Sequence, residues 1–156
     1  MTAQELKQQC LELMEASEAA YLGTLDASGS PQIRAVSNLR RKQEFPSLAP
    51  LFQDHTDDFL VYIATNTSSN KLRQVRANPA ACVYYCVPSQ FHGLMLEGLI
   101  EVADDLDLKR ALWQPAWETF WTGGPADPDY IVLRLLPRRA SGWWWDKTFE
   151  FSLPGR

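Results

Sequence analysis

The sequence contains few of the residues on which metal centres and nucleophilic enzymes depend. Its 156 residues include two histidines and three cysteines, Cys10, Cys82 and Cys86. Two histidines and no nucleophile-elbow motif give no support to a Ser-His-Asp triad. Cys82 and Cys86 lie four residues apart on a predicted strand, a separation of ~13 Å, whereas zinc binds each thiolate at ~2.3 Å. We therefore expect neither a hydrolase nor a zinc site, and we interpret the cysteines as free thiols.

Positive charge and long apolar runs are also scarce. Lys and Arg number 15 against 19 Asp and Glu, so the net charge is −4. The runs Arg40–Lys42 and Arg138–Arg139 are narrower than the basic footprint of a nucleic-acid-binding protein. No apolar run approaches the ~20 residues of a membrane span, and the polar N-terminus lacks the apolar segment of a secretory signal. We expect a cytoplasmic protein with free thiols that binds neither nucleic acid nor membrane.

The residues that are present are typical of one globular domain, which we expect to span residues 1–156. Hydrophobic residues make up 46% and charged residues 22% of the chain, as in ordinary soluble domains. Six Trp, seven Phe and five Tyr are many for this length. Such an aromatic content suggests a large buried interface or a flat ligand in addition to a core.

The hydrophobic period changes from helical to alternating near residue 18. A helical stripe over residues 3–18, opened by a capping box of Thr2 and Glu5, predicts the first helix. A long loop with a short helical turn is expected over residues 41–58, and Gly98 predicts a bulge. Further helices are predicted up to Ala77 and after Asp105. Strands are predicted at residues 20–26, 32–39, 59–65, 80–87, 93–103, 130–136 and 140–145, with a weak edge strand at 148–153.

The order of these elements predicts the fold class. Strands dominate at short spacing, with one small helix between strands and a longer one before the last pair. This order predicts a mainly β fold, an antiparallel β-barrel with peripheral helices, and argues against a doubly wound parallel sheet. Trp113, Trp117 and Trp121 recur every fourth residue, and we interpret this stripe as core and dimer packing.

The clearest chemical signal is the junction between a predicted strand and helix at Thr65–Lys71. A helix start presents free N–H groups and a partial positive charge, and hydroxyls with a lysine there suit a phosphate. The alternative is that Ser68 or Ser69 only caps the helix and that Lys71 is solvated. Arg34, in the middle of the return strand, either needs a carboxylate or phosphate partner or lies on an exposed strand face.

A series of short segments carries a resemblance to a known family. In order, they are Tyr21–Asp26, Gly29–Pro31, Arg34–Leu39, Ile63–Lys71, Asn78–Pro79, Leu96–Gly98, Leu112–Trp113 and Gly123–Tyr130. In this order and spacing they resemble the pyridoxamine 5′-phosphate oxidase-like FMN-binding split-barrel family, and within it the general stress protein branch. The resemblance extends over about residues 13–145.

This resemblance implies a six-stranded antiparallel split β-barrel that forms a homodimer, with two FMN sites in the cleft between protomers. Arg34 would contact the FMN phosphate side, and the backbone of the following four residues would meet the isoalloxazine edge. Thr65, Ser69 and Lys71 match other phosphate-side positions. The predicted cofactor-binding residues are Arg34, Ala35, Val36, Ser37, Asn38, Thr65, Ser69, Asn70 and Lys71.

The chain departs from the oxidases of that family at three places. Asn70 stands where they carry the arginine of a Ser-Arg-Lys sequence, and Leu39 stands where they carry a lysine. Arg40 or Arg41 could compensate for the missing charge. The Arg-x-His motif that holds the substrate phosphate is also missing, because the tail has Ser141–Trp145 and no histidine follows His92. We therefore do not expect oxidation of pyridoxamine 5′-phosphate.

The resemblance leaves three hypotheses for function. The first is an FMN-dependent small-molecule oxidoreductase, with hydride transfer at flavin N5. The second is a flavin-binding or stress-response module without turnover. The third is a split barrel for haem or a deazaflavin, in which His55 and His92 are the available imidazoles for haem. Trp143, Trp144 and Trp145 alternate between strand faces, so one face could meet a flavin ring while the other packs.

Overall fold

The computed structural model describes residues 1–156 and consists mainly of strands. The strands are β1 (Ala20–Leu25), β2 (Pro31–Val36), β3 (Val61–Asn66), β4 (Ala80–Val87), β5 (His92–Ala103), β6 (Tyr130–Trp144) and β7 (Lys147–Ser152). The helices are α1 (Ala3–Ala16), α2 (Ala49–Phe52), α3 (Asn70–Ala77) and α4 (Leu106–Leu112). Short 3₁₀ turns lie at Pro46–Leu48, Pro88–Gln90, Pro115–Thr119 and Gly124–Ala126. No helix is both long enough and apolar enough to span a membrane.

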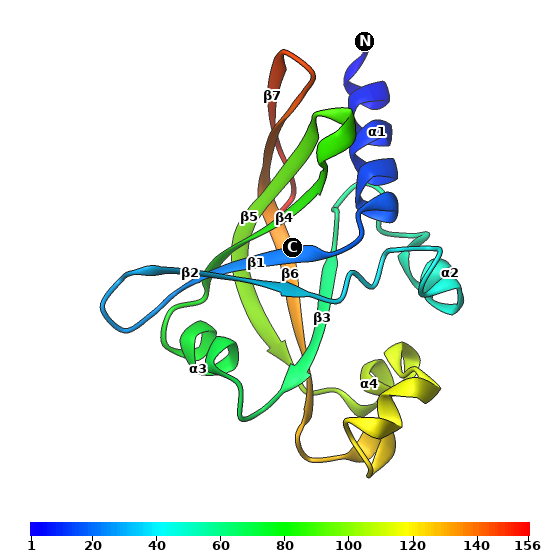
Figure 1. The fold of residues 1–156 in the computed structure, drawn as a ribbon, viewed down its shortest axis with the longest axis vertical. Helices are drawn as coiled ribbons and strands as arrows, with labels where there is room; N and C mark the ends of the chain where they lie inside the picture. The colour runs from blue at the N-terminus through cyan, green and yellow to red at the C-terminus, as the bar shows by residue number, and fades with distance from the viewer.

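The strands form one antiparallel sheet in the order β2-β1-β4-β5-β6-β3, and β7 pairs with β6 beside this path. The sheet curls around the long strands β5 and β6 into a half-barrel, with the helices at its periphery (Figure 1). The predicted fold class is therefore confirmed. Six strands make the continuous path, and the weak edge strand expected at 148–153 is a regular seventh strand.

The last predicted pair of strands is one strand in the structure. β6 runs without a break from Tyr130 to Trp144, so the expectation of separate strands at 130–136 and 140–145 was wrong. The misleading residue is Pro137, which lies opposite Gly98 where the pairing register shifts. A proline is tolerated at a bulge, because the ladder hydrogen bond is already interrupted there. The predicted irregularity at Gly98 is confirmed by the same shift.

The first helix and hairpin follow the sequence patterns closely. Glu5 N–H donates to Thr2 Oγ1 at 3.1 Å, and Thr2 N–H donates to Glu5 Oε2 at 2.7 Å, which completes the expected capping box. β2 ends at Val36 rather than at residue 39. The chain turns away there because the Asn38 side chain donates to the Met14 carbonyl oxygen at 2.7 Å, at the end of α1.

Two apolar clusters pack on the sheet, on opposite faces of the paired strands β3 and β6, because Val61 and Ile63 belong to one cluster and Tyr62 to the other. The larger one joins α1 and α3 to strands β1 and β3–β6. The smaller one joins β3 and β6 to the segments around α2 and α4. In it, Trp117 and Trp121 are buried and pack around Tyr130, with the Trp121 and Tyr130 ring centroids 4.8 Å apart. The core role predicted for the tryptophan stripe is thus confirmed, and its role in dimer packing stays a prediction.

Candidate functional site

The β1–β2 hairpin directs Arg34 towards α3. Arg34 pairs in register with the buried Leu22, so its side chain lies on the face of the hairpin that α3 covers. Its Nη1 donates to Thr24 Oγ1 at 2.7 Å and to the Leu22 carbonyl oxygen at 3.2 Å. No carboxylate lies within ion-pair distance of this guanidinium, whose pKa is lowered by burial.

α3 brings a second cation to the same place. Ser69 is the N-cap, with its Oγ accepting from Leu72 N–H at 3.3 Å, and Thr65 Oγ1 donates to Ser69 Oγ at 3.5 Å. Lys71 follows in the first turn and makes no ion pair. Its pKa is lowered by burial and then by the positive charge of Arg34. Two cations therefore approach one another beside the start of a helix with no anion of this chain between them.

Gln74 holds Arg34 against α3, and sequence analysis missed it. Its Oε1 accepts from Arg34 Nη2 at 2.8 Å and from Thr24 Oγ1 at 2.6 Å. Gln74 follows Lys71 by three residues, so the two side chains lie on the same face of α3. In the sequence, this spacing was the only indication that Gln74 lies near Lys71. The partner strand could not be known without the packing of α3 on β1.

The hydroxyls before α3 divide into two groups. Thr67 Oγ1 donates to Asp129 Oδ1 at 2.7 Å, and Ser68 Oγ donates to the same oxygen at 3.4 Å. These two hydroxyls are therefore engaged by a carboxylate and do not join the cations. Thr65 and Ser69 contact one another and no carboxylate. Asn70 begins α3, and its side-chain oxygen accepts a hydrogen bond from Arg73.

The residues after Arg34 are alternately available and unavailable to a ligand. Ala35 and Ser37 are exposed, whereas Val36 is half-buried. Asn38 is buried, and its amide donates to the Met14 and Ser17 carbonyl oxygens at 2.7 and 2.9 Å. The Asn38 side chain therefore holds the end of α1, and only its backbone is available to a ligand.

Neither Arg40 nor Arg41 supplies the charge missing at Asn70. Arg40 is buried and donates from Nε to the Leu60 carbonyl oxygen at 3.0 Å, just before β3 begins. Thr65 lies five residues further along that segment, which is ~16 Å at the usual strand rise. Arg41 pairs with Glu44 at 3.5 Å. The suggested compensation was wrong.

Part of the outer face of the sheet carries neither apolar cluster. By register, the outward residues of β2, β1, β4, β5 and β6 share this outer face: Ile33, Ala35, Tyr21, Tyr84, Met95 and Trp143. The Ile33 side chain is 72% exposed. Trp143 stacks on Tyr84 with ring centroids 5.8 Å apart, whereas Trp144 stacks on His92. The two tryptophans thus serve opposite faces, as the alternation predicts.

A comparison with known protein families shows to which family this chain belongs. A family model described as pyridoxamine 5′-phosphate oxidase matches residues 6–144. The chain belongs to the pyridoxamine 5′-phosphate oxidase family. The resemblance inferred from the motifs is therefore confirmed.

Several solved structures share the fold over nearly the whole chain. A protein from Clostridium acetobutylicum related to general stress protein 26 is 26% identical, with a TM-score of 0.78 and coverage of 97% of this chain and 96% of the other. General stress protein 26 from Bacillus anthracis is 18% identical, with a TM-score of 0.70 and coverage of 94% and 99%. A haem-binding protein from Mycobacterium smegmatis is 12% identical, with a TM-score of 0.67 and coverage of 97% and 59%. No curated protein matches the sequence.

Proposed function

We propose that this member of the family is a cytoplasmic, single-domain, homodimeric flavoprotein that binds FMN at the subunit interface and acts as a small-molecule oxidoreductase. One observation carries the proposal. Arg34 and Lys71 lie beside the same helix start, and neither is paired with a carboxylate. A doubly negative phosphate monoester is the chemical group that such an arrangement accepts best.

The residues present fit the phosphate end of FMN. Lys71 and Arg34 would supply two positive charges, and Thr65 and Ser69 would supply hydroxyls beside the first turn of α3. The backbone of Ala35–Asn38 would follow the flavin edge, and Asn70 would contribute an amide in place of a cation. When bound, FMN supplies hydride transfer at N5. The chain itself supplies position, positive charge and, through a partner on the outer face, exclusion of water.

The substrate differs from that of the family's named oxidases. β6 carries Trp143 and Trp144 where those oxidases carry the Arg-x-His motif that holds the substrate phosphate. A substrate phosphate would therefore find no dedicated cation. We propose reduced nicotinamide or another small donor as the source of electrons.

A flavin-binding module without turnover is the second candidate. The observation that favours it is that the described cluster contains cations, hydroxyls and an amide, and no carboxylate or imidazole that could move a proton. Mixing the purified protein with NADPH in the absence of oxygen distinguishes the two candidates. Bleaching of the flavin band, reversed by air, supports the enzyme, whereas an unreduced flavin supports the module.

The decisive experiment measures FMN affinity in Lys71→Ala. Loss of one charge-assisted contact with the phosphate should weaken FMN about 10- to 100-fold. Arg76→Ala, on the exposed last turn of the same helix, is the matched control and should bind like the wild type. Equal affinity of Lys71→Ala and the wild type would refute the phosphate contact. A haem band in place of the flavin spectrum would refute the cofactor.

A further inference from the structure

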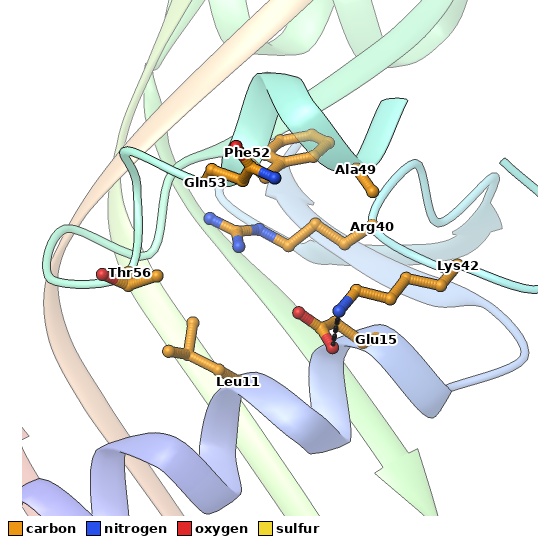
Figure 2. Close-up of a pocket in the computed structure, with 8 residues that line it drawn as sticks. All are labelled: Leu11, Glu15, Arg40, Lys42, Ala49, Phe52, Gln53 and Thr56. Atoms are coloured by element: carbon orange, nitrogen blue, oxygen red, sulfur yellow. Dashed lines mark ion pairs between the residues drawn. The ribbon is translucent and has the colours of Figure 1, made fainter. Parts of the chain in front are cut away.

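A hollow of about 210 Å³ lies between α1 and the segment that carries α2, away from the cations of the proposed FMN site. Figure 2 shows Arg40 extending across it, with Leu11 on the side of α1 and Phe52 on α2. Gln53 and Thr56 complete the polar part of the lining.

The cation in this hollow is held rigidly and lacks an ion pair. Arg40 is 6% exposed, and no carboxylate lies within 4.0 Å of its guanidinium. Nε donates to the Leu60 carbonyl oxygen and Nη2 to the His55 carbonyl oxygen, both at 3.0 Å. The guanidinium carbon lies 4.5 Å from the centre of the Phe52 ring. Nη1 has no acceptor in the chain, so its N–H groups remain available at the hollow.

No surrounding carboxylate contacts that cation, and Asp58 and Glu15 act on it only from a distance. At the rim, Lys42 Nζ lies 3.0 Å from Glu15 Oε2, so these two charges offset one another. Asp58 is engaged on the other side, where it accepts from Leu60 N–H at 3.1 Å and lies 2.9 Å from His55 Nδ1. A buried charge without a partner is costly, and a small anion would relieve that cost.

We propose that this hollow binds a short aliphatic monocarboxylate, with its carboxylate on Arg40 and its alkyl end against Leu11 and Ala49. A guanidinium edge matches the two oxygens of a carboxylate. Because Lys42 and Glu15 offset one another at the rim, the hollow offers the single positive charge of Arg40, which matches a monoanion better than a dianion such as phosphate. The hollow has room for a chain of a few carbons and some water.

Titration calorimetry with propionate tests the proposal, with propionamide and inorganic phosphate as probes of charge and shape. Propionate should give saturable binding that Arg40→Met abolishes. Propionamide and phosphate should give none at the same concentrations. Absence of saturable propionate binding, or equal binding of propionamide, would overturn the proposal.

Two rim variants keep the test independent of whether Arg40→Met folds. Glu15→Gln removes a like charge and should tighten propionate binding about 2- to 5-fold, whereas Lys42→Gln should weaken it by a similar factor. Ala49→Leu should fill the hollow and abolish binding without touching a charge. Circular dichroism and the thermal midpoint confirm that each variant is folded. Rim variants that shift the affinity in the same direction would contradict the electrostatic argument.

Discussion

At the scale of single residues, the most informative side chains are the cations that lack an acidic partner. Exposed Lys and Arg without an ion pair are common in this chain, but Arg34, Lys71 and Arg40 are partly or fully buried. Arg34 and Lys71 share the neighbourhood of one helix start, and Arg40 faces a hollow. In each place the fold holds the positive charge with neutral acceptors or none, which leaves its electrostatic attraction for an anion from solution.

The burial of His92 leads us to expect that the stability of the protein depends on pH. Burial lowers the pKa of this imidazole from its ordinary value of 6.5, so the folded state favours the neutral ring. As pH falls below 6.5 the unfolded chain takes up a proton before the folded one, and the free energy of unfolding decreases. Urea unfolding at pH 7.5 and 5.5 should show a larger decrease for the wild type than for His92→Gln. Equal decreases would contradict the assignment.

The backbone conformation of Trp145 leads us to expect that its replacement by glycine stabilises the protein. Its φ is 57° and its side chain is 61% exposed, so a bulky residue adopts a left-handed backbone with little burial in return. Trp145→Gly should raise the free energy of unfolding by about 1 kcal/mol, because glycine adopts this conformation without strain. Lys147→Gly, at an exposed position of β7, is the control and should be destabilising. A less stable Trp145→Gly would show that the ring contributes more than the strain costs.

At the scale of elements, the hydrophobic periodicity of the sequence was sufficient to predict the position of a strand or helix that has one buried face. It predicted α1 with its capping box and placed β4 at residues 80–87, as the structure has it. It failed where a tertiary contact decides the local structure. Pro137 reads as a strand end, yet the pairing with β5 carries β6 through it.

The same limit applies to the candidate site. Arg34 and Lys71 were predicted from the chemistry of their own segments and from the family motifs, and the structure places each beside the other. Gln74 was missed because its role depends on the packing of α3 against β1. The guess about Arg40 and Arg41 failed for a related reason. Nearness in sequence to the Arg34 segment did not mean nearness to the end of β3.

Gln74 now provides a test of the element that joins α3 to the hairpin. Gln74→Glu gives Arg34 the carboxylate partner that it lacks, without changing the length of the side chain. The free energy of unfolding should stay the same or rise, whereas FMN affinity should fall about 10-fold or more, because the carboxylate competes with the phosphate. FMN titration and urea unfolding of the same preparation measure both effects. An FMN affinity in Gln74→Glu equal to that of the wild type would show that Arg34 does not contact the FMN phosphate.

At the scale of the whole molecule, the two faces of the sheet are covered unequally. The larger apolar cluster lies within the curl under α1 and α3, whereas the smaller cluster, with the segments around α2 and α4, covers the opposite face at the β3–β6 end of the sheet (Figure 1). The outer face of β2, β1 and β4 carries neither cluster. That face presents the exposed Ile33 together with the stacked pair of Tyr84 and Trp143. A second copy of the chain would bury this surface, and because β2 is the edge strand it would also lie near a ligand that extends from Arg34 past that edge.

Ile33→Glu tests this arrangement, because a charge at the centre of an apolar interface opposes association. We expect the variant to sediment as a monomer at concentrations where the wild type is a dimer, and to lose FMN in parallel. Phe120→Glu is the matched control, since Phe120 is 74% exposed against 72% for Ile33 but lies on the turn after α4. It should remain dimeric. A wild-type protein that sediments as a monomer while retaining FMN would show that one chain is sufficient to bind the cofactor. A monomeric Ile33→Glu that retains FMN would show that FMN binding does not depend on this interface.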